Sequence, residues 1–160
     1  MKIKSFTIVE VLITMGILFL ILNSSILFFG GPNLDVVLKD EAYRIETTLR
    51  SARYRSLIKE KDSNWGVYFS NLREFKPFYS IFYGDSYLET KSEGKKNLDN
   101  ALFFNIPTSG TTSVIVFEEL TGNLKNATSF EVEIRIKKMP NVGKKIKVNQ
   151  VGAIEVEEIK

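Results

Sequence analysis

Few residues of this chain could do chemistry, and the first of them is Glu10, a lone carboxylate in an apolar run. The sequence has 160 residues and contains no cysteine and no histidine. It therefore has no thiol nucleophile, no disulfide, no zinc site of the usual ligands and no histidine general base. No cluster of carboxylate, lysine or tyrosine residues converges toward a catalytic site. We expect a protein that is not an enzyme and that uses no cofactor.

Glu10 is the only charged residue in the apolar run 6–29. As a helix this run would be about 36 Å long, enough to cross the roughly 30 Å hydrocarbon core of a bilayer. It is too long for a secretory signal, and no small-residue cleavage site follows it. The sequence predicts an uncleaved transmembrane helix over 6–29, with Lys2 and Lys4 on the cytoplasmic side. A charge inside such a helix is a candidate functional residue that needs a partner.

The stretch Lys4–Ile13, KSFTIVEVLI, resembles the leader and mature start of a type IV pilin. In that family a short basic leader precedes a small residue and a phenylalanine, and the fifth residue of the mature chain is a glutamate. The resemblance implies that a prepilin peptidase removes leader 1–5 by cleaving between Ser5 and Phe6, and then methylates the amine of Phe6. Glu10 would act in assembly, paired with the new cationic terminus of its own chain or of a neighbour. Ser5 stands where glycine is usual, but it is still a small residue.

After the Gly-Gly-Pro of residues 30–32, an amphipathic helix is predicted over 34–61. Its main apolar face carries Leu34, Leu38, Ala42, Ile45, Leu49, Ala52 and Ser56. A weaker stripe lies almost opposite and consists of Val36, Tyr43, Tyr54 and Ile58. This stripe is either a set of ordinary surface side chains or a face that meets neighbouring subunits.

The segment 62–160 is predicted to be a β-rich globular head. Strands are expected at 65–70, 78–83, 101–106, 113–118, 130–137, 145–149 and 153–159. The polar segment Glu89–Asn100 is predicted to be a loop. The predicted fold class is α+β: a long N-terminal helix, with a transmembrane half and an amphipathic half, packed on an antiparallel head.

Two short motifs in the head, Trp65-Gly66-Val67 and Ile146–Asn149 followed by Gly152, resemble GspH/FimT-type minor pseudopilins. The resemblance implies a head of two antiparallel sheets and a structural subunit of a type II secretion pseudopilus or a type IV pilus. Its implied partners are other pilin or pseudopilin subunits, the prepilin peptidase, the inner-membrane assembly platform and membrane lipid. The expected location is the cytoplasmic (inner) membrane, crossed once, with a filament-associated head on the periplasmic or extracellular side.

A cluster of lysines around one predicted hairpin turn offers an alternative function. It consists of Lys137, Lys138, Lys144, Lys145 and Lys147. Such lysines either keep an edge strand from pairing or bind DNA, as in FimT-like pilins that serve DNA uptake. The hairpin tip has no arginine, and no aromatic side chain to stack on bases, so a DNA-binding minor pilin is the disfavoured alternative. A membrane-anchored enzyme is disfavoured by the missing catalytic residues.

Four oxygen-bearing residues could suggest a calcium site, because some pilin-class heads bind calcium through oxygen ligands. The candidate ligands are Asp85, Glu89, Asp99 and Asn100. Their spacing is not dense enough for a calcium loop, so they are predicted to be solvated and no metal site is expected.

Overall fold

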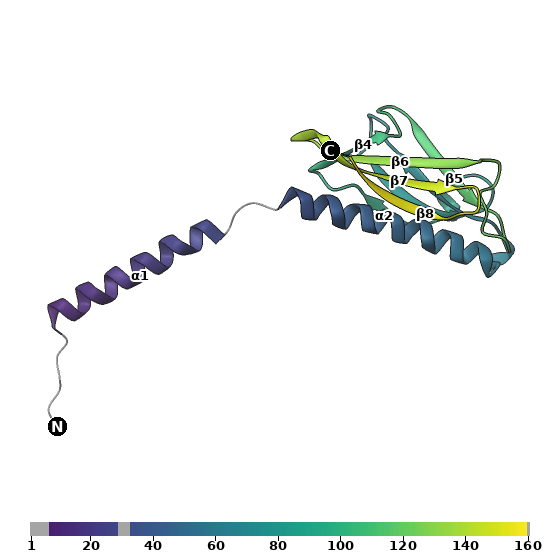
Figure 1. Ribbon diagram of the computed structural model, residues 1–160. Coiled ribbons are helices and arrows are strands. Elements are labelled where there is room, and N and C mark those ends of the chain that lie inside the picture. Colours follow the sequence, from purple (N-terminus) through teal and green to yellow (C-terminus); the bar gives the residue numbers. More distant parts are fainter. Residues whose placement is uncertain (1–6, 29–32, 160) are drawn as a thin grey trace, which may run out of the picture. The chain divides into compact units, whose positions relative to one another are not determined.

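A computed structural model of the chain describes residues 7–28 and 33–159, with the side chains of the first helix described as far as Leu20. The chain divides into two compact units, Met1–Asn33 and Leu34–Lys160. The first contains helix α1 (Ile8–Phe28), and the second contains the remaining elements (Figure 1). These are α2 (Leu34–Leu57), η1 (Glu60–Asp62), β1 (Trp65–Ser70), β2 (Phe78–Tyr83), η2 (Glu89–Lys91), β3 (Ser92–Asn97), β4 (Leu102–Ile106), β5 (Thr112–Phe117), β6 (Ser129–Ile136), β7 (Met139–Asn149) and β8 (Ile154–Ile159).

None of the helices in the described part of the chain combines the length and the apolarity needed to cross a membrane. The transmembrane helix over 6–29, the fold class built on it and the inner-membrane location are therefore corrected. The structure describes α1 from Ile8 to Phe28, within the predicted span. Helix α1 and helix α2 belong to the two separate units of the chain.

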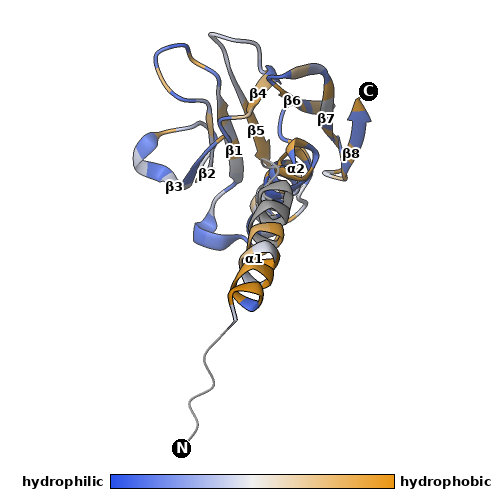
Figure 2. Cartoon of the chain, turned by 90° about the vertical axis from the view of Figure 1, so that its left-hand side faces the viewer, coloured by the Kyte–Doolittle hydropathy of each residue, from blue (hydrophilic) through white to orange (hydrophobic). Residues whose placement is uncertain are grey.

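The Leu34–Lys160 unit is α+β, with α2 packed against two antiparallel sheets. The predicted apolar face of α2 is buried at Leu38, Ala42, Ile45, Leu49, Ala52 and Ser56, which confirms that part of the helical pattern. The helix contacts β1, β2 and β5 of one sheet and β6, β7 and β8 of the other. Figure 2 shows α2 nearly end-on, with the two sheets on either side of it. Burial of one helix face by both sheets accounts for the length of its apolar stripe.

The sheets have the strand orders β3-β2-β1-β5 and β4-β6-β7-β8, and all pairs are antiparallel. The strands predicted at 65–70 and 78–83 are confirmed with those bounds, and the other predicted strands are present with shifted ends. The segment Glu89–Asn100 is not simply a loop, because it contains β3. This strand lies at a sheet edge, where polar residues are tolerated, and Gly94 (φ 69°) lies where its pairing with β2 shifts register. It therefore lacks the apolar alternation that marks the other strands.

Aromatic contacts join the two sheets in the core. The Phe69 ring on β1 lies 6.0 Å from Tyr79, 6.0 Å from Phe104 and 5.7 Å from Phe130, measured between ring centroids. The alternation predicted for β6 is confirmed at Val132, Ile134 and Ile136, which are all buried. These contacts hold the two sheets together, and the buried face of α2 packs against both of them.

Candidate functional site

The candidate calcium ligands do not form a metal site. In residues 7–28 and 33–159 there is no group of three or more acidic residues that could hold a metal ion. Asp85 instead accepts hydrogen bonds from Lys125 Nζ at 2.8 Å and from Asn64, and these two donors hold the pKa of Asp85 below its usual value. Asp99 caps its own turn by accepting a hydrogen bond from the Ala101 amide at 2.8 Å.

Glu10 lies in the first turn of α1, and its backbone amide takes part in the cap of this helix. Its backbone amide donates to Thr7 Oγ1 at 3.3 Å and to the Thr7 carbonyl at 3.1 Å. Thr7 is thus the N-cap of α1, and Glu10 is the third helical residue, as in the Thr-x-x-Glu capping box. A glutamate there also interacts favourably with the helix dipole. The predicted cleavage site, Ser5 and Phe6, lies outside the described residues.

The lysine cluster is largely neutralised within its own sheet. Lys144 Nζ lies 2.7 Å from a Glu158 oxygen, and Lys147 Nζ lies 2.8 Å from a Glu157 oxygen. Lys145 Nζ lies 3.6 Å from Glu131 and 3.8 Å from Glu133. The remaining two, Lys137 and Lys138, are exposed at the turn between β6 and β7.

This arrangement bears on both interpretations of the cluster. Strand β7 lies between β6 and β8, so its lysines do not protect a sheet edge as one interpretation assumed. They pair with glutamates across the strands instead, and the bond from Lys147 to Glu157 raises the pKa of that lysine. Paired lysines have less charge to offer phosphates, which weakens the case for a DNA site.

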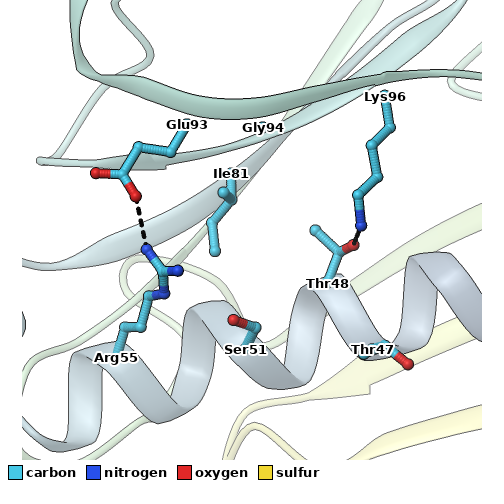
Figure 3. Close-up of a pocket in the computed structure, with 8 residues that line it drawn as sticks. All are labelled: Thr47, Thr48, Ser51, Arg55, Ile81, Glu93, Gly94 and Lys96. Atoms are coloured by element: carbon cyan, nitrogen blue, oxygen red, sulfur yellow. Dashed lines mark hydrogen bonds and ion pairs between the residues drawn. The ribbon is translucent and has the colours of Figure 1, made fainter.

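A groove of about 410 Å³ lies between α2 and the edge strand β3 (Figure 3). It is lined by Thr47, Thr48, Ser51 and Arg55 from α2, Ile81 from β2, and Glu93, Gly94 and Lys96 from β3. In the sheet register Glu93 pairs with Ile81, and Lys96 pairs with Tyr79. Because paired residues share a face, both charged side chains are on the α2 side of the sheet. We call this feature the α2–β3 groove.

The two ends of the α2–β3 groove differ in charge. At one end Glu93 accepts hydrogen bonds from Lys61 and, at 2.7 Å, from Arg55 Nη1, and these two cations hold the pKa of Glu93 below its usual value. At the other end Lys96 Nζ donates to Thr48 Oγ1 at 3.3 Å. Figure 3 shows Ser51 on the helix between these two ends. Sequence patterning could not find the groove, because β3 lies in a segment without apolar alternation.

A second unusual feature is a buried carboxyl group, Glu41, beneath β2. Glu41 is 4% exposed and Tyr79 is fully buried. Neither Glu41 Oε1 nor Tyr79 Oη has a hydrogen-bond partner in the described part of the chain. Burial raises the pKa of Glu41, and the neighbouring Tyr79 hydroxyl and Arg44 guanidinium offset this only in part. The folded state therefore favours the neutral form of this carboxyl group.

The buried Glu41 predicts a distinctive pH dependence of stability. Its pKa in the folded state is above the unfolded value of 4.5, so its contribution to the free energy of unfolding is complete below that value. The contribution is lost as the pH rises through the folded pKa. Glu41→Gln, which is always neutral, is expected to raise the free energy of unfolding at pH 7 and to remove this decline.

Urea denaturation between pH 4 and pH 8 measures the effect. The matched control is Glu46→Gln on the same helix, which removes an i,i+4 pair with Arg50 and is expected to cost at most about 0.5 kcal/mol with no change in pH slope. A Glu41→Gln protein that kept the wild-type decline would show that another group causes it.

Comparison with known proteins found no relative: no family model matches the chain, and neither a curated protein nor a solved structure matches it. The function must therefore be argued from the residues and their geometry.

Proposed function

We propose that this chain is a structural subunit of a pilin-class filament, a minor pilin or pseudopilin of a type IV pilus or a type II secretion pseudopilus. A prepilin peptidase removes residues 1–5 and methylates Phe6. The partners of the mature chain are other subunits of the same class and the platform that assembles them. The resemblance of residues 4–13 to the pilin start and the surface of α1 support this proposal.

The observation that carries the proposal is the exposed apolar surface of α1. Ile8 is 79% exposed, Leu12 65%, Met15 67% and Leu18 59%. Other apolar side chains between them are exposed as well, namely Val9, Val11, Ile13 and Ile17. A helix that is apolar on all sides is unfavourable in water and requires an apolar partner surface. Equivalent helices of neighbouring subunits supply such a surface in a filament.

Glu10 gives this helix packing a defined register. It is the only charged residue between Thr7 and Phe28. Among apolar helices a carboxylate is costly unless it meets an opposite charge, and the new amine terminus at Phe6 provides one. A pair between Glu10 of one subunit and the terminus of its neighbour favours one axial offset over all others.

The head presents a second surface to neighbours. Tyr43 is 67% exposed, Tyr54 62% and Val36 59%, all on the face of α2 opposite the core. Ile58, which is 52% exposed, directly follows the end of this helix. The apolar stripe predicted on that face is thus available for contact between heads. It supports the filament proposal, but ordinary surface side chains would also be exposed.

The proposal is tested by removing the charge of Glu10 while keeping the shape of its side chain. Glu10→Gln is expected to abolish recovery of the chain in filaments sheared from cells that possess the assembly machinery, because the register-setting pair is lost. Wild-type chain is expected in the same fraction. The measurement is immunodetection of the chain in sheared and cell-bound fractions.

Two controls separate assembly from capping and from processing. Thr7→Ala removes the N-cap hydroxyl of α1 but keeps Glu10, so it is expected to be recovered in filaments. Intact mass should show loss of residues 1–5 and gain of one methyl group in wild type and in both variants. If the Thr7→Ala protein were absent from the sheared filaments while the Glu10→Gln protein was present, assembly would depend on the helix cap and not on the charge of Glu10. A full-length mass in cells that have the peptidase would contradict the pilin class itself.

A further inference from the structure

We propose that the α2–β3 groove binds a small hydroxylated carboxylate of the size of a sugar acid. The groove adjoins the exposed stripe of α2, since Thr47 lies one helical turn after Tyr43. Its volume of about 410 Å³ is within the range of small-molecule pockets in proteins. Its lining combines hydroxyl groups, one available cation and one apolar side chain, which is the set of groups that such a ligand would need.

The carboxylate of the ligand is assigned to Lys96. A lysine ammonium group has three donors, and among the described residues Lys96 Nζ has one hydrogen-bond partner, Thr48 Oγ1. The Thr48 hydroxyl donates to the Arg44 carbonyl at 2.8 Å, so its lone pair faces the lysine and holds it in place. No carboxylate in the described part of the chain lies within ion-pair distance of Lys96, in contrast to Lys144, Lys145 and Lys147 on β7. Two charge-assisted donors are therefore available to an anion.

The opposite end of the groove does not repel an anion. Glu93 is the one carboxylate of the lining, and Arg55 and Lys61 both pair with it. Arg55 also lies 3.7 Å from Glu60. With Lys96 and Lys61 this leaves three cations against two carboxylates, so the local charge is positive by one. A ligand carboxylate at Lys96 thus meets a favourable potential along the groove.

Hydroxyl groups of the ligand are assigned to the middle of the groove. Ser51 lies on the helix between the two charged ends, and its side chain makes no hydrogen bond to another described residue. A hydroxyl group can donate and accept at once, which suits the hydroxyls of a sugar. Ile81 is 8% exposed and provides an apolar contact for the carbon skeleton. A carboxylate without hydroxyls would use only the Lys96 end, and a neutral sugar only the middle.

The test is ligand-observed saturation-transfer NMR on the full chain, titrated with glucuronate, glucose and acetate. Glucuronate is expected to bind at least about tenfold more tightly than glucose or acetate, since each of these lacks one set of contacts. Lys96→Gln is expected to weaken glucuronate binding about tenfold or more and to leave glucose binding unchanged. Ser51→Ala is expected to weaken binding of glucuronate and glucose but not of acetate.

Lys95→Gln is the matched control, because Lys95 is the neighbouring lysine but its Nζ lies over the Phe78 ring, 3.9 Å from the centroid. It is expected to bind glucuronate as wild type does. The proposal would be overturned by equal binding of glucose and glucuronate, by equal losses in Lys95→Gln and Lys96→Gln, or by the absence of saturable glucuronate binding. Circular dichroism of each variant verifies that a loss does not come from unfolding.

Discussion

Replacing Gly152 with alanine is expected to lower the free energy of unfolding by about 2–4 kcal/mol. Gly152 has φ 74°, and this left-handed conformation costs other residues roughly 1 kcal/mol. An added Cβ would lie 2.2 Å from the Gly122 carbonyl oxygen and 2.6 Å from Arg53 Nε. Because the first contact is with backbone, the two turns must separate, at a further cost of about 1–3 kcal/mol.

The clash also disrupts a link between α2 and the head. Arg53 Nε donates to the Gly122 carbonyl at 3.2 Å, and Arg53 Nη2 donates to the Val151 carbonyl at 3.0 Å. Urea unfolding followed by the fluorescence of the single tryptophan, the buried Trp65, measures the loss.

Gly94→Ala is the matched control for this prediction. Gly94 has φ 69°, but an added Cβ would have no neighbouring atom within 4 Å. It therefore isolates the backbone strain and is expected to cost about 1 kcal/mol. If the two alanine variants were equally stable, steric contact at Gly152 would not be the cause.

Gly66→Ala is expected to cost about 2–3 kcal/mol through contact alone, since Gly66 lies inside β1 with an ordinary extended backbone. An added Cβ would lie 2.4 Å from the Ile115 carbonyl oxygen and 2.8 Å from Phe82 Cζ. Phe82 is directly opposite Gly66 in the register of β1 and β2, and its ring is fully buried. The close approach of the ring leaves no room for a methyl group, and overpacking of this kind strains the neighbouring strands.

A double-mutant cycle tests which neighbour is responsible. With Phe82→Leu as the background, Gly66→Ala is expected to cost about 1 kcal/mol less than it does in the wild type, because the shorter side chain leaves space. The contact with the Ile115 carbonyl remains in both backgrounds. If Gly66→Ala cost the same in both backgrounds, the contact with the Ile115 carbonyl on β5 would account for the whole effect. Stability is again measured by urea unfolding.

Both glycines belong to the two short motifs noted in residues 65–67 and 146–152, and the sequence alone offered no physical reason for them. Gly66 is needed because β2 places a buried ring over it, and Gly152 because the turn near Gly122 approaches its backbone. These neighbours are distant in sequence. A short motif can therefore mark such a position, but only the packing explains it.

Ser56 illustrates the same limit within α2. It continues the apolar stripe by its spacing, yet its hydroxyl accepts from the Trp65 amide at 2.8 Å and donates to the Phe117 carbonyl at 3.0 Å. It connects the end of α2 to the beginning of β1 and the end of β5. Periodicity predicted that the residue is buried, but not that it satisfies backbone groups of two strands.

The sequence by itself determined the α2 core face and most strands, because these depend on local alternation of apolar and polar residues. It also determined the absence of cysteine and histidine chemistry and the apolar character of residues 6–29. Tertiary structure decided three other matters. It made the polar segment 92–97 a strand by supplying β2 as a partner, it neutralised the β7 lysines with glutamates of β6 and β8, and it brought Lys96 to the hydroxyls of α2. Each depends on residues far apart in the chain, whose meeting no local pattern encodes.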